Sequence, residues 1–101
     1  MDERIDKIIE NLKEVYDPEI PVNIYDLGLI YNVDVDENNK VSIVMTLTAP
    51  GCPVADMLVD DTKQAALAVE GVDDAEVELT FEPPWDKSMM SEEARLELGF
   101  F

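Results

Sequence analysis

Residues 45–58, Met-Thr-Leu-Thr-Ala-Pro-Gly-Cys-Pro-Val-Ala-Asp-Met-Leu, predict the end of a strand, a tight turn and the beginning of a helix. Alternating apolar and polar residues over 41–48 indicate a strand with one buried face. A proline and Gly51 interrupt this pattern, and Pro53 suits the first position of a helix, where its missing N–H would have no partner. The only cysteine of the chain, Cys52, therefore stands at or next to the N-cap of that helix.

The predicted position of Cys52 favours the reactive form of its thiol. The first N–H groups of a helix lack partners within the helix, and the helix dipole is positive at this end. Both effects favour the thiolate, which attacks electrophiles and binds metals. A lone free cysteine is also commonly a small buried apolar residue. The residues alone leave a functional and a structural role about equally open.

Hydrophobic periodicity on both sides of this turn predicts the order α-β-β-α-β. The predicted helices cover about 3–16 and 53–70, and the predicted strands cover 31–35, 41–48 and 75–82. A polar turn makes the first two strands a hairpin, and the crossover helix makes the second and third strands parallel. We expect a two-layer α+β fold, in which two helices cover one face of a three-stranded mixed sheet and polar side chains cover the other. The sequence does not decide which strand neighbours the last one.

Two further segments flank this predicted unit. The loop at 22–29 is unusually apolar, so we expect it to pack on the domain. Asp26 is the exception within it, and a turn or capping aspartate is its simplest interpretation. Near the C-terminus, Ser91 caps a short predicted helix that ends before Gly99. Trp85, Phe100 and Phe101 either fold over the edge of the core or form an oligomer or partner surface.

Composition and charge restrict the classes of function. A chain of 101 residues predicts one domain over residues 1–101. Its 24 acidic and 7 basic residues give a net charge of −17, which argues against binding to nucleic acid or to an anionic membrane. A solvated acidic surface is the simplest interpretation, and a patch for a basic partner and a high-salt habitat are the alternatives. Without a long apolar run or a signal-peptide pattern, we expect a soluble, cytoplasmic protein.

The absence of histidine and of a second cysteine excludes several kinds of site within this chain. A Ser-His-Asp triad, a Cys-His dyad and a histidine-ligated zinc all need a histidine. An internal disulfide needs a second cysteine. No G-x-x-x-x-G-K-[ST] pattern is present, so ATP hydrolysis would have to come from a separate partner.

Four short motifs, in this order, resemble the small iron–sulfur cluster assembly domain family that includes SufT and PaaD. The motifs are Asp17-Pro18-Glu19-Ile20, Asp26-Leu27-Gly28-Leu29-Ile30, Leu47-Thr48-Ala49-Pro50-Gly51-Cys52-Pro53 and Phe81-Glu82-Pro83-Pro84-Trp85. The resemblance covers nearly the whole chain. It implies an accessory role in which clusters are carried or targeted to client apoproteins, together with other iron–sulfur assembly proteins. It also implies that Cys52 is the reactive or cluster-contacting thiol, supported by Asp26, Thr48, Gly51 and Pro53.

The resemblance stops short of a complete metal site. PaaD-like proteins carry additional C-terminal cysteines that this chain lacks. Iron–sulfur clusters are usually held by four protein ligands, and even a homodimer would supply only two thiols. We therefore expect an iron–sulfur cluster to be bound only transiently, with Cys52 as the chain's metal ligand and a second subunit, a small thiol or the client completing the site.

Two other classes of function remain open at this point, although we expect a protein without enzymatic activity. In one, Cys52 is the nucleophile of a thiol-based redox or transfer enzyme that acts on a disulfide, a persulfide or an acyl group. The chain offers neither an obvious base nor a resolving cysteine for this chemistry. In the other, the protein is a non-catalytic adaptor whose acidic surface docks clients together with Trp85, Phe100 and Phe101.

Overall fold

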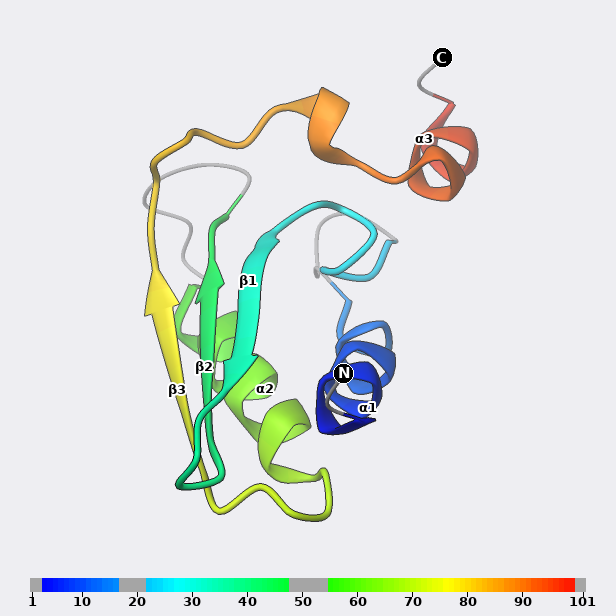
Figure 1. Ribbon diagram of the computed structural model, residues 1–101. Coiled ribbons are helices and arrows are strands. Elements are labelled where there is room, and N and C mark those ends of the chain that lie inside the picture. The colour runs from blue at the N-terminus through cyan, green and yellow to red at the C-terminus, as the bar shows by residue number, and fades with distance from the viewer. Residues whose placement is uncertain (1–2, 17–21, 48–54, 100–101) are drawn as a thin grey trace.

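The computed structural model describes residues 3–16, 22–47 and 55–99, and Figure 1 shows their arrangement. Within these ranges the order of elements is the predicted one, including the short C-terminal helix that Ser91 caps and that ends before Gly99. The elements are α1 (Glu3–Leu12), β1 (Ile30–Val35), β2 (Lys40–Met45), α2 (Ala55–Leu67), β3 (Asp74–Leu79), the 3-10 helix η1 (Lys87–Met89) and α3 (Glu92–Leu98). No helix within the described ranges combines the length and hydrophobicity that a membrane span requires.

The three strands form one mixed sheet in the order β1-β2-β3. β1 and β2 are antiparallel, with Val33 opposite Ile43, and β2 and β3 are parallel, with Ile43 opposite Val77. β2 is therefore the central strand, which answers the question that the sequence left undecided. Both edge strands, β1 and β3, keep one side without a partner in the described sheet.

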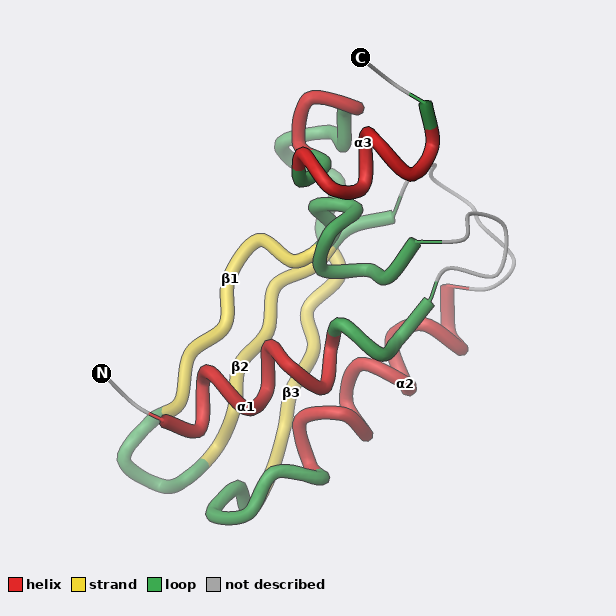
Figure 2. The backbone as a smooth tube through the Cα atoms, turned by 90° about the vertical axis from the view of Figure 1, so that its right-hand side faces the viewer, coloured by secondary structure: helices red, strands yellow, loops and turns green. Residues whose placement is uncertain are grey.

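Both long helices, α1 and α2, cover the same face of the sheet (Figure 2). The buried core lies between the two layers. Burying one large apolar side chain there stabilises the fold by about 1.5–3 kcal/mol. The opposite face is polar, as predicted, because Asp34, Ser42 and Glu76 lie side by side across the three strands and are all exposed. The largest fully buried apolar side chains are Ile8, Leu12, Ile24, Leu27, Leu29, Val41, Ile43, Met45 and Leu58.

The first helix is shorter than predicted, because α1 ends at Leu12 instead of continuing to about residue 16. Val15 and Tyr16 instead face the returning chain. The N–H of Ile24 donates to the carbonyl oxygen of Val15 at 2.8 Å, and Tyr16 forms a β-bridge with Asn23. This pairing between segments replaces the last helical turn.

Arg4 of α1 stabilises the end of the sheet at which the β1–β2 turn lies. Its Nη1 donates to Asn39 Oδ1 at 2.7 Å and to the carbonyl oxygen of Gly71 at 3.0 Å. Asn39 has a φ of 63°, in the left-handed region. One side chain thus joins α1, the β1–β2 turn and the connection from α2 to β3.

Candidate functional site

Three described segments meet at the end of the sheet where β2 and β3 finish, at the top of Figure 1. They are the 22–29 loop, the two residues after β2, and residues 80–91, which we call the strap. The N–H of Thr46 donates to Leu29 O at 2.8 Å, and the N–H of Thr80 donates to Met45 O at 2.8 Å. Thr46 and Leu47 are both buried. The chain therefore leaves β2 at a point fixed on one side by the 22–29 loop and on the other by the strap.

The 22–29 loop is ordered by Asn23, a residue that the sequence analysis did not single out. Asn23 Oδ1 accepts from the N–H of Asp26 at 2.9 Å, and Asn23 Nδ2 donates to Asp26 Oδ2 at 2.8 Å. Asn23 is therefore the capping side chain of this turn, and the Asp26 carboxylate is its partner. An asparagine three residues before the aspartate is a turn signal that could have identified it.

The strap donates hydrogen bonds to main-chain carbonyl groups of the same loop. Trp85 Nε1 donates to Leu27 O at 2.6 Å, and the N–H of Ser91 donates to Asp26 O at 2.8 Å. The Tyr31 hydroxyl donates to Pro83 O at 2.7 Å and adds a tie to β1. These bonds connect residues more than 50 positions apart in the sequence. They fix the backbone that carries Asp26.

Gly28 allows the strap to approach the loop closely. Its φ is +81°, and a Cβ added there would overlap the carbonyl oxygen of Met89 and lie 2.7 Å from the Met89 carbonyl carbon. Any other residue would therefore be strained at this position and would also push the strap away.

The structure describes two of the residues predicted for the site or its surroundings. Asp26 is half-buried, and Trp85 is half-buried and packs against the core, as the packing alternative for the C-terminal segment predicts. The Trp85 indole N–H is bonded within the chain, and the side chain is only partly exposed. The other predicted residues lie outside the described ranges and stay predictions: Thr48, Gly51, Cys52, Pro53, Phe100 and Phe101.

The described residues do not form a metal site of their own. Within the described ranges, no group of three or more histidine, cysteine, aspartate or glutamate residues is placed to hold a metal ion. The complete sequence contains one cysteine and no histidine. A cluster carried by this chain would therefore need ligands from elsewhere.

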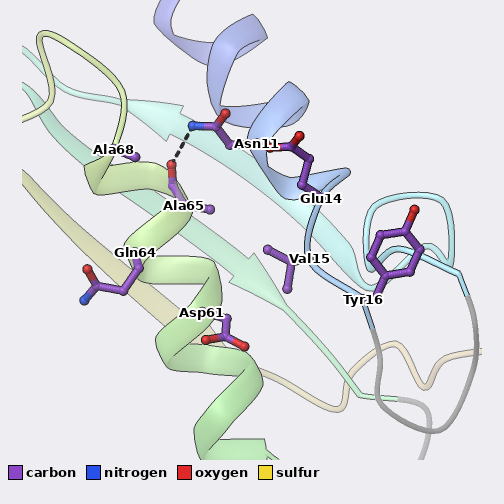
Figure 3. A pocket seen from close by; sticks show the side chains of 8 residues that line it. All are labelled: Asn11, Glu14, Val15, Tyr16, Asp61, Gln64, Ala65 and Ala68. Atoms are coloured by element: carbon purple, nitrogen blue, oxygen red, sulfur yellow. Dashed lines mark hydrogen bonds between the residues drawn. The ribbon is translucent and has the colours of Figure 1, made fainter.

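Described residues line cavities near this end of the molecule. A cavity of about 270 Å³ separates the 22–29 loop from α3, and Asp26, Glu93 and Glu97 are among its lining residues. A larger hollow of about 470 Å³ lies between the end of α1 and α2 (Figure 3), where Asn11 Nδ2 donates to Ala65 O at 3.0 Å. The larger hollow contains none of the predicted site residues, and its lining is mostly small or polar.

The sequence of this chain is similar to those of known proteins. The family described as "Iron-sulfur cluster assembly protein" matches residues 5–79. The chain is 59% identical over 93 residues to a Fe-S protein maturation auxiliary factor of Porphyromonas gingivalis, a match that covers 92% of this chain and 89% of that protein. It is 40% identical to the Fe-S protein maturation auxiliary factor SufT of Staphylococcus aureus, over 84% of this chain and 97% of that protein.

The fold also matches a solved structure. The crystal structure of a domain of unknown function, DUF59, from Bacillus anthracis superimposes with a TM-score of 0.90 at 42% sequence identity. That match covers 98% of this chain and 94% of the other. The two-layer α+β architecture predicted from the sequence is therefore confirmed.

Proposed function

Because this chain belongs to the iron–sulfur cluster assembly protein family, we propose that it is an accessory factor that carries or targets iron–sulfur clusters to recipient apoproteins. The observation that carries the proposal is the meeting of the 22–29 loop, the end of β2 and the strap at one end of the sheet. The segment that contains Cys52 begins directly after Leu47, which is buried at this meeting point, and leads into α2.

In this proposal Cys52 is the cluster-contacting thiol. Its segment ends at the first residue of α2, a helix of 13 residues whose N-terminal dipole favours a thiolate. Asp26 Oδ2 accepts from Asn23, so its second carboxylate oxygen offers an acceptor to a protonated thiol or a client N–H group. Thr48, Gly51 and Pro53 then shape the connection between strand and helix.

Transfer to a client is a ligand exchange at iron. A client thiol loses its proton and its thiolate binds the iron, while Cys52 leaves the iron and is protonated again. No electron is gained or lost, so neither an oxidant nor a reductant is needed. Since one thiolate cannot hold a cluster alone, the remaining ligands come from a second copy, a small thiol, another assembly protein or the client. We place this exchange in the cytoplasm, where single thiols stay reduced.

Anaerobic activation of a client apoprotein tests the role of the thiol. The assay compares wild type with Cys52→Ser at equal iron and sulfide, and we expect the variant to activate the client no better than a reaction without the protein. A second variant, Cys52→Ser with Ser42→Cys, places one thiol on the exposed sheet face as a matched control. We expect this relocated thiol to restore nothing. Equal activation by wild type and Cys52→Ser would overturn the proposal.

A further inference from the structure

β3 is an edge strand whose two faces carry different kinds of side chain. It is the last strand of the sheet and forms its outer side on the left of Figure 1. Its side chains alternate between two kinds. Asp74, Glu76 and Glu78 are exposed on the open face, whereas Val77 and Leu79 are only half-buried on the face toward the helices. The border of the sheet thus carries an acidic row and an apolar row on opposite faces.

The backbone of β3 offers hydrogen-bonding groups at this border. The N–H of Thr80 donates to Met45 O of β2, so the even-numbered residues of β3 direct their backbone groups toward β2. Because these groups alternate along a strand, those of Val77 and Leu79 point away from the sheet. The N–H of Ala75 points the same way, and it is satisfied at 2.9 Å by the carboxylate of Asp74.

The opposite edge of the sheet is less suited to pairing. The register of β1 shifts between Ile30 and Asn32, which indicates a β-bulge, and bulges discourage the addition of a strand. β3 has a continuous register with β2 over all six residues and contains no bulge. An added strand would therefore meet a regular template only at β3.

Charge decides which strand fits. A second copy of the chain would bring Glu76 and Glu78 against its own acidic row, and like charges on neighbouring strands are destabilising. Among the described residues of the acidic row, Glu76 alone has a cationic partner, Lys40, at 3.3 Å. We propose that the β3 edge binds an extended segment of a partner protein in which basic and apolar residues alternate. The basic residues face the acidic row, and the apolar residues cover Val77 and Leu79.

The test of this inference contains neither a cluster nor a thiol reaction. The probe is the synthetic peptide acetyl-Lys-Val-Lys-Val-Lys-Val-Lys-amide, added to the full chain at low salt. NMR measures the hydrogen exchange of individual amides with and without the peptide. We expect slower exchange at Val77 and Leu79. A peptide of the same composition with four lysines followed by three valines is the control for charge alone, and it is expected to leave these two amides unchanged.

Two charge reversals complete the test. Glu78→Lys removes one attraction and adds one repulsion, so it should weaken binding of the alternating peptide about tenfold. Asp34→Lys makes the same change in charge on the same face, but on β1, and should alter binding less than about twofold. The proposal is overturned if the peptide does not slow exchange at Val77 and Leu79. It is equally overturned if both peptides act alike or if both variants weaken binding to the same extent.

Discussion

Replacing Gly28 with alanine should separate the strap from the 22–29 loop. The new Cβ would overlap the Met89 carbonyl group, and an L-residue at a φ of +81° costs about 1–2 kcal/mol in itself. If the strap moves away, the bonds of Trp85 to Leu27 and of Ser91 to Asp26 are lost, at about 1 kcal/mol each. Together these effects lower the free energy of unfolding by about 3–4 kcal/mol, a large part of the stability of a small domain.

Gly99→Ala provides the matched control for this prediction. Gly99 also has a positive φ, of +77°, but no atom lies within 4 Å of an added Cβ. Gly99→Ala should therefore lower the free energy of unfolding only by the backbone strain, about 1–2 kcal/mol. Urea unfolding measured by far-UV circular dichroism gives both free energies. Emission from Trp85, the only tryptophan of the chain, should shift to longer wavelength in Gly28→Ala alone. Equal costs for the two variants, or an unchanged emission, would refute the close approach of strap and loop.

Three further predictions concern the body of the domain. Arg4→Met removes two hydrogen bonds and should lower the free energy of unfolding by about 2 kcal/mol. Lys7→Met, on the exposed side of α1, should change this free energy by less than about 0.5 kcal/mol. Urea unfolding measures both variants, and equal effects would contradict the role of Arg4. The side chain of Leu58 is 0% exposed, so Leu58→Ala should lower the free energy of unfolding by about 3 kcal/mol in the same assay. The neighbouring Met57 is 47% exposed, so Met57→Ala should lower it by less than about 1 kcal/mol. The reverse order would mean that the packing of α2 is misassigned. At a net charge of −17, the acidic side chains repel one another, and salt screens this repulsion. The melting temperature at pH 7 should therefore rise between low salt and about 0.15 M sodium chloride. A fall would show that attractive ion pairs outweigh the repulsion.

The sheet and its two covering helices could be predicted because their signals are local. Alternation along β3 marks its buried and exposed faces residue by residue, and the 3- and 4-residue spacing in α1 marks its buried side. The helical crossover from β2 to β3 required a parallel pair. The hairpin turn at 36–39 is equally local, since Asp36 Oδ1 accepts from the N–H groups of Asn38 and Lys40.

The remaining features depend on contacts between distant segments, for which a single sequence carries no periodic signal. α1 stops at Leu12 because Val15 finds its partner in Ile24. Trp85 was expected either to pack or to form a partner surface, and only the bond to Leu27, 58 residues away, shows how it packs. In the candidate site, Asp26 was singled out for its chemistry, but its capping partner Asn23 was not. The chemistry expected of Cys52 stays a prediction that the client assay tests.

In the part of the chain that the structure describes, the hydrogen bonds from the strap to the 22–29 loop end on main-chain oxygens of the loop. Trp85 and Ser91 both donate to carbonyl oxygens, which are present whatever side chains Asp26 and Leu27 carry. Substituting Asp26 would therefore change the side chain that the loop presents while leaving these main-chain bonds in place. The location of the loop and its chemistry are thus set by different parts of the chain, so selection can change one without disturbing the other.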